Sequence, residues 1–197
     1  MEYSTLDKLG VRVSRLGFGC MRFPLTAEGK IDEPRAAAML DTAYKAGVTY
    51  YDTAYFYHQH TGEAFLGRAM KRYPRDTFYL ATKMPMSIVE SLDHAKEIFE
   101  GQLAALQTDY VDFYLLHAVN GERWKQAQEM GIVDFLLEMQ KAGRIRHFGF
   151  SFHGSYEEFE TILTARDWDF CQIQFNYMDQ EIQAGMRGYA LAEKLGV

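Results

Sequence analysis

The stretch Val48–Tyr57, VTYYDTAYFY, passes from an apolar run into a loop. Its β-branched and aromatic residues are typical of a buried strand. Asp52 stands where this run ends, Tyr57 follows five residues later, and a segment of helical periodicity comes next. The stretch therefore predicts a strand, a loop and a helix in succession, with reactive side chains at the end of the strand.

The same unit recurs along the chain. Expected strands lie at residues 15–23, 48–54, 77–83, 110–118, 145–152 and 170–176. Expected helices lie at residues 33–47, 62–73, 91–107, 132–143 and 155–165, and a sixth is expected after the last strand, in the segment that ends AEKLGV. Gly47, Gly143 and Gly196 stand where helices would end, at positions that favour a positive φ. Strict alternation of strand and helix predicts parallel strands joined by helical crossovers.

Two architectures have this alternation. A doubly wound sheet normally carries a glycine-rich phosphate loop after its first strand, and GFGCMRFP at residues 17–24 is a poor match to one. We therefore predict an α/β fold, a TIM-type (β/α) barrel that forms a single domain over residues 1–197, with six of eight units present. Residues 3–16 predict a β-hairpin that turns at Lys8–Gly10 and covers one end of the barrel.

Composition narrows the class of protein. The 197 residues are 48% hydrophobic, which suffices for one sizeable core. A net charge of -6 with scattered basic residues argues against nucleic acid as a partner. The first fifteen residues contain no continuous apolar stretch, so neither a signal peptide nor a membrane partner is expected, and we predict a cytoplasmic location. Cys20 and Cys171 are too few for a disulfide framework, and both are expected to be buried thiols.

Polar side chains recur at the predicted strand ends. The second to fifth strands end at Asp52, Lys83, His117 and Ser151, and the sixth carries Gln172, Gln174 and Asn176 at alternate positions of one face. Any one of them is readily explained as a hydrogen-bonded strand end. Barrel enzymes, however, draw their working residues from the C-terminal ends of several strands, so the recurrence predicts an active site there.

The residue types indicate carbonyl reduction. A lysine ammonium beside a tyrosine hydroxyl stabilises the phenolate, which makes Tyr57 a usable general acid next to Lys83. Asp52 would hold the lysine, and a neutral His117 could orient a carbonyl oxygen toward the tyrosine proton. A cofactor must supply the hydride, because no side chain donates one.

At these residues the chain resembles the aldo-keto reductase superfamily, whose members are eight-stranded barrels that reduce aldehydes and ketones with NADPH. The family pattern D-T-A-x-x-Y matches DTAYFY, its T-K pair matches LATK, and its L-L-H matches YLLHA. The resemblance implies that Asp52, Tyr57, Lys83 and His117 are catalytic and that the substrate is a small carbonyl compound.

The resemblance also implies a cofactor site. The family serine and glutamine fall on Ser151 and Gln172, which would hold the nicotinamide carboxamide. Met21, Arg22 and Asp52 are also expected to bind the cofactor. Met21, Arg22 and Met84 follow strand ends and would line the cleft. Phe152 replaces the asparagine that follows the family serine, and His58 replaces the glycine that follows the tyrosine. The second change makes the substrate mouth bulkier.

The segments GFSFH and GCMRFP resemble a bacterial and archaeal branch of the superfamily whose members often continue into an iron-sulfur segment. Such a segment is not expected in these 197 residues. An eight-unit barrel of about 250 residues needs about 60 more. We therefore expect a barrel truncated after its sixth unit, without the last two loops that hold the cofactor phosphates in this family. Its first and sixth strands would expose edges through which the chain could self-associate.

Two alternatives remain open at this stage. His58 and His60, together with Asp52 and His117, are residue types that bind metals, so a metal-dependent barrel hydrolase is conceivable. Histidines in a loop are more often solvated, however. The other alternative is an inactive or regulatory barrel, which would bind nucleotide without turnover or bind none.

Overall fold

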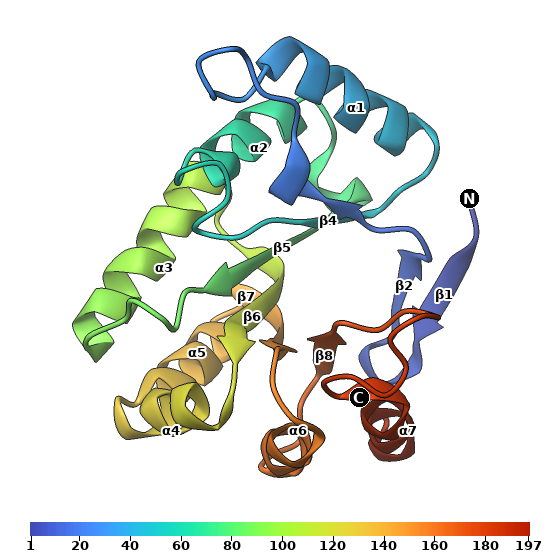
Figure 1. The fold of residues 1–197 in the computed structure, drawn as a ribbon. Coiled ribbons are helices and arrows are strands. Elements are labelled where there is room, and N and C mark those ends of the chain that lie inside the picture. Colours follow the sequence, from blue (N-terminus) through green and yellow to red (C-terminus); the bar gives the residue numbers. More distant parts are fainter.

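Six parallel strands form one curled sheet in the computed structural model, which describes all residues 1–197 (Figure 1). In spatial order they are β3 (Phe18–Gly19), β4 (Tyr50–Asp52), β5 (Tyr79–Met84), β6 (Val111–Val119), β7 (Ile145–Phe152) and β8 (Phe170–Ile173). Each strand pairs with its neighbour in the sequence, in parallel. The predicted α/β alternation with parallel strands is confirmed.

Seven helices lie along the outside of the curl (Figure 1). They are α1 (Glu33–Lys45), α2 (Gly62–Met70), α3 (Leu92–Leu106), α4 (Gly121–Glu129), α5 (Ile132–Lys141), α6 (Tyr156–Thr164) and α7 (Gly185–Leu195). The main core fills the space between helices and sheet, and it includes the fully buried Phe99, Leu136 and Trp168. None of the helices combines the length and apolar character needed to cross a membrane.

The predicted hairpin is confirmed as β1 (Tyr3–Leu6) paired antiparallel with β2 (Val11–Ser14). Gly10 closes the turn with φ +64, which glycine adopts without strain. Apolar side chains of the hairpin pack on a small inner cluster that includes Phe113 and the first residues of β4, β5 and β8. The hairpin therefore covers the N-terminal end of the curled sheet.

Several predicted boundaries are wrong for local reasons. The first strand is only Phe18–Gly19, because residues 20–22 turn into a 3-10 helix between Gly19 and Phe23. The sixth strand ends at Ile173, so Gln174 and Asn176 do not line a strand face. The Asn176 side chain instead accepts two downstream backbone N–H groups, an alternative to the sheet ladder that asparagine offers readily.

Other differences concern helices and thiols. The helix predicted at 62–73 stops at Met70, and α4 was not predicted. Helix α4 buries only Trp124 and Ala127, so its sequence contains few apolar residues that could indicate a helix. Cys20 is buried as expected, but Cys171 is only partly buried, and both are free thiols.

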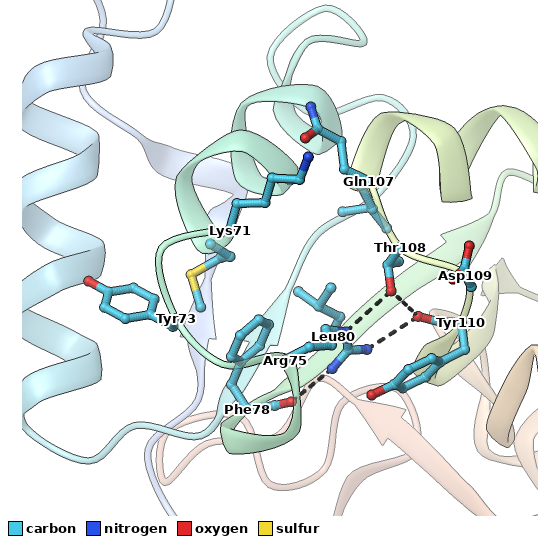
Figure 2. A pocket seen from close by; sticks show the side chains of 12 residues that line it. Lys71, Tyr73, Arg75, Phe78, Leu80, Gln107, Thr108, Asp109 and Tyr110 are labelled. Carbon is cyan, nitrogen blue, oxygen red and sulfur yellow. Dashed lines mark hydrogen bonds between the residues drawn. The ribbon is translucent and has the colours of Figure 1, made fainter.

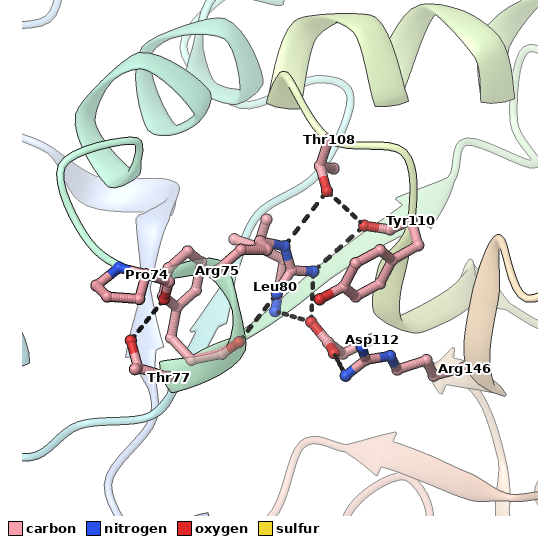
Figure 3. Close-up of polar contacts among 9 residues, drawn as sticks. Pro74, Arg75, Thr77, Leu80, Thr108, Tyr110, Asp112 and Arg146 are labelled. Atoms are coloured by element: carbon pink, nitrogen blue, oxygen red, sulfur yellow. Dashed lines mark hydrogen bonds and ion pairs between the residues drawn. The ribbon is translucent and has the colours of Figure 1, made fainter.

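A buried carboxylate joins three strands near their N-terminal ends (Figure 3). Asp112 is fully buried, and its Oδ2 accepts from Arg75 Nη2 at 2.6 Å and from the Leu80 N–H at 2.9 Å. Its Oδ1 accepts from Arg146 Nη1 at 2.9 Å. The two guanidinium groups offset the cost of burying this charge, so Asp112 stabilises the contacts of β6 with β5 and β7.

A cavity of about 260 Å³ lies beside this cluster, near the ends of α2 and α3 (Figure 2). Arg75 lines it and donates to Thr108 Oγ1, to the Tyr110 carbonyl and to the Phe78 carbonyl. These donors are already used within the fold. The N-terminal end of the sheet is thus built for stability.

We expect Asp112→Ala to lower the free energy of unfolding by about 3 kcal/mol, because it leaves the Leu80 N–H and two guanidinium groups without their acceptor. Urea unfolding at pH 7 measures this loss. Asp109→Ala, at an exposed position three residues earlier, is the control and should change stability by less than about 0.5 kcal/mol. Equal effects of the two substitutions would contradict the role of Asp112.

Candidate active site

Side chains from several strands meet at the C-terminal end of the sheet. The structure places Asp52 at the end of β4, Lys83 in β5, His117 in β6, Ser151 in β7, Gln172 in β8 and Tyr57 in the loop after β4. Lys83 is 1% exposed, and its Nζ donates to Asp52 Oδ1 at 2.6 Å and to the Thr53 carbonyl at 2.7 Å. Burial raises the pKa of the Asp52 carboxyl, and the Lys83 ammonium opposes that rise.

Tyr57 lies next to this ion pair. The Lys83 Nζ is 5.2 Å from the centroid of the tyrosine ring. An ammonium has three N–H donors, and two of those of Lys83 go to Asp52 and Thr53. The third has no partner within the chain. The Lys83 Nζ therefore lies close to both the Asp52 carboxylate and the Tyr57 ring, without a hydrogen bond to the tyrosine hydroxyl.

The loop that carries Tyr57 has an unusual backbone. His58, Gln59 and His60 all have φ between 52° and 67°, in the left-handed region. Each such residue costs about 1 kcal/mol or more when it has a Cβ atom. Thr61 bonds back to the His58 carbonyl through both its N–H and its hydroxyl, which closes the turn.

Glycine follows this turn for a steric reason. The Gly62 N–H donates to the Tyr57 carbonyl at 3.1 Å, and a Cβ at Gly62 would lie only 3.0 Å from that oxygen. The absent side chain lets α2 begin directly against the tyrosine backbone. The turn and Gly62 together fix where Tyr57 stands.

His117 faces Tyr57 across the site. The ring centroids are 6.3 Å apart and the rings are nearly perpendicular. Burial lowers the pKa of His117 to about 4, and the positive charges of Lys83 and Arg123, together with His153, contribute. The imidazole is therefore neutral at pH 7, and one ring nitrogen can donate a hydrogen bond without a formal charge.

Ser151 and Gln172 occupy paired positions on β7 and β8. The Ser151 Oγ accepts the Ala118 N–H at 2.8 Å, so its own O–H remains a donor. The Gln172 side chain lies beside the Asp52 carboxylate, whose Oδ2 is buried without a hydrogen-bond partner. The result is a group of donors and acceptors next to the Lys83 ion pair.

Met21 and Arg22, predicted to follow the first strand, are exposed, whereas Met84, predicted to follow the third, is buried. Met21 and Arg22 lie on the 3-10 helix that follows β3, and both are exposed. Met84 is fully buried in the main core, so the prediction that it lines the cleft is wrong. Met84 is the last residue of β5. Its side chain packs in the core between the sheet and the helices, on the opposite face of the strand from Lys83.

The histidines proposed as metal ligands are used otherwise. His58 Nε2 lies 3.3 Å from the Phe23 N–H and 3.1 Å from the Cys20 carbonyl, so it tethers the loop to the end of β3. His60 packs against the ring of Tyr55. No three histidine, cysteine or acidic side chains gather in an arrangement that could hold a metal ion.

A buried polar network behind Lys83 escaped the sequence analysis. Gln102, on α3, donates through Nε2 to the Lys83 carbonyl at 3.0 Å and to Glu63 Oε1 at 2.8 Å, and accepts the Tyr114 hydroxyl at 2.6 Å. Thr82 also donates to Glu63. A glutamine on the apolar face of the predicted helix at 91–107 was the available signal.

Comparison with known proteins identifies the class. The sequence profile described as "Aldo/keto reductase family" matches residues 15–197, and the chain belongs to that family. Aldo-keto reductase YhdN of Bacillus subtilis is 29% identical over 99% of this chain. Norsolorinic acid reductase stcV of Emericella nidulans is 32% identical over 72% of it.

Solved structures agree with this assignment. The holo form of aldo-keto reductase AKR11C1 from Bacillus halodurans covers the whole chain with a TM-score of 0.81 and 29% identity. The chain spans 64% of that structure, 60% of YhdN and 40% of stcV. It therefore spans less than two thirds of the length of each of these proteins.

The depressed pKa of His117 makes stability depend on pH in a defined direction. The pKa of an unfolded histidine is about 6.5. Between pH 6.5 and 4, His117 is therefore protonated in the unfolded chain and largely unprotonated in the folded chain. Stability contributed by His117 is thus lost as pH falls through this window. We expect the native chain to lose about 3 kcal/mol more than His117→Gln between pH 7 and pH 4.

Urea unfolding of both proteins at the two pH values measures the difference. Other groups titrate alike in both chains, so only the difference between them reports on His117. Equal losses would show that the imidazole gains its proton as readily in the fold as in the unfolded chain.

Proposed function

We propose that this protein is an NADPH-dependent reductase of aldehydes or ketones, with Tyr57 as the general acid, in a barrel of eight strand–helix units. The observation that carries the proposal is the buried Lys83–Asp52 ion pair beside Tyr57, with an uncharged His117 facing the tyrosine. Family membership supports the same chemistry.

The residues present fit a nicotinamide carboxamide. A primary carboxamide needs a donor for its oxygen and an acceptor for its nitrogen, and Ser151 and Gln172 offer both from adjacent strands. The buried, unpartnered Asp52 Oδ2 adds an acceptor beside Gln172. When bound, NADPH supplies the hydride. We propose Met21 and Arg22 as further contacts, since they lie exposed after β3.

The chain's own groups would act on the carbonyl oxygen. His117 donates a hydrogen bond that orients the substrate and stabilises the charge that grows on this oxygen. Tyr57 then transfers its hydroxyl proton to the oxygen, which yields the alcohol. The Lys83 ammonium stabilises the phenolate that remains, and Asp52 keeps the ammonium in place. The near-complete burial of Lys83 strengthens its attraction to Asp52.

Tyr57→Phe tests the general acid in a chain extended by two further strand–helix units. We expect kcat for aldehyde reduction to fall by about 10² to 10⁴, because the proton donor is lost. The affinity for NADPH should change by less than about twofold, since the ring is retained. The loss of NADPH fluorescence during turnover gives kcat, and the change in NADPH fluorescence on titration with the protein gives the affinity.

Tyr55→Phe is the matched control, because it removes a hydroxyl from the same loop two residues earlier. It should keep the activity of the unmodified chain. If Tyr57→Phe also kept it, Tyr57 would not be the acid. Binding of NADPH with no turnover by the unmodified extended chain would favour the alternative of an inactive or regulatory barrel.

We further propose that the 197-residue chain self-associates through its sheet edges. β3 and β8 each pair with only one neighbour, and an apolar groove of about 530 Å³ lies beside β3. Leu16 and Met39 line this groove and are 62% and 43% exposed. Unpaired backbone groups next to apolar side chains favour pairing with another chain.

Light scattering should therefore give a mass above the 22.7 kDa of one chain. The same chain should bind NADPH more weakly than the extended one, because the last two loops supply phosphate contacts in barrels of this kind. A monomer that binds NADPH as tightly as the extended chain would contradict both expectations. A cytoplasmic location stays a prediction.

A further inference from the structure

A β-bulge interrupts β6 directly after His117. The register with β7 slips between Leu116 and Val119. Within the slip, Ala118 has φ +49, a left-handed conformation that residues with a side chain rarely adopt. Bulges next to a functional site re-aim a side chain, and the side chain that precedes this one is the imidazole. The direction of His117 therefore depends on what holds Ala118.

Two side chains hold both polar groups of Ala118. Its N–H donates to Ser151 Oγ at 2.8 Å, and its carbonyl accepts from Arg123 Nη1 at 2.7 Å. The bulge takes these groups out of the strand ladder, and a buried backbone group without a partner costs about 1 to 3 kcal/mol. Ser151 thus replaces the missing ladder bond of the Ala118 N–H, and Arg123 replaces that of the Ala118 carbonyl.

The place of Arg123 in the chain supports this use. It is the third residue of α4, behind the N-cap Asn120, whose side chain accepts the Arg123 N–H at 3.0 Å. The N-terminus of a helix is the positive end of its dipole and disfavours a cation. The cap fixes the start of the helix, and the bond to Ala118 accounts for an arginine at this position.

We propose that Arg123 is a positioning residue that, together with Ser151, clamps the Ala118 peptide and so holds His117 toward Tyr57. Only the role of His117 in catalysis rests on the proposed function; the clamp itself is a property of the folded chain. Because Ser151 also offers its hydroxyl to the cofactor site, the clamp connects that site to the carbonyl-binding imidazole.

The same arrangement places positive charge around His117. The titratable groups that face it are Lys83 on β5, Arg123 on α4, His153 after β7 and the Tyr57 ring. Burial is the largest cause of its lowered pKa, and the three basic groups act in the same direction. Loss of the guanidinium therefore has two effects, a freer Ala118 peptide and a more basic imidazole.

Arg123→Met tests the clamp in the 197-residue chain, since it keeps the length of the side chain and removes its charge and donors. NMR follows two signals, the Ala118 amide and the titration of the His117 ring. We expect the amide resonance to shift and the midpoint of the ring titration to rise by about half a pH unit. Arg123→Lys should restore the midpoint more than the amide, because lysine keeps the charge without the planar fork.

Lys125→Met removes an exposed cation from the same helix and is the control; both signals should stay at their native positions. If Arg123→Met matched this control, the proposal would be overturned. If Arg123→Met failed to fold, Arg123→Lys would decide: a shifted Ala118 amide supports the clamp, and a native one refutes it.

Turnover separates the two proposals. In the extended chain, a misplaced His117 should lower kcat by about tenfold to 100-fold. A protein that showed both NMR changes but reduced no carbonyl compound would keep the clamp and lose the proposed function.

Discussion

The ion pair between Lys83 and Asp52 is the constraint on which the site depends. A lysine with 1% of its surface exposed is stable only if its charge is compensated, and its Nζ finds a carboxylate at 2.6 Å on the adjacent strand. That contact requires β4 and β5 to be neighbours in register, with Asp52 opposite Ala81 and the lysine two residues beyond. Gln102 bonds the lysine carbonyl from the helix layer, so both ends of the residue are held.

Much of this could be predicted from the sequence because it follows from strand geometry. Parallel strands bring their C-terminal ends to one edge, so the polar residues that end the second to fifth strands had to meet there. The hairpin could be predicted for a similar reason, since the glycine turn and short apolar runs are local signals.

Some of the remaining features depend on bonds between segments distant in sequence. The bulge at Ala118 exists because Ser151 and Arg123 accept and donate there, and no periodicity reports such a pair. The short first strand and the unexpected α4 have a different, local origin. The 3-10 helix at Cys20–Arg22 ends the strand, while α4 begins after Asn120 and buries too few apolar residues to be recognised in the sequence.

The His58 tether has a mechanical consequence. Its Nε2 lies within hydrogen-bond distance of the Cys20 carbonyl and of the Phe23 N–H, and its tautomer decides which of the two it bonds. Both groups lie immediately beyond the edge strand β3, while the peptide of His58 follows Tyr57. The left-handed turn offers little slack to absorb displacement, because few backbone conformations close it. A displacement along the edge of the sheet is therefore passed to the Tyr57 ring. Whatever packs against that edge thus affects the position of the ring.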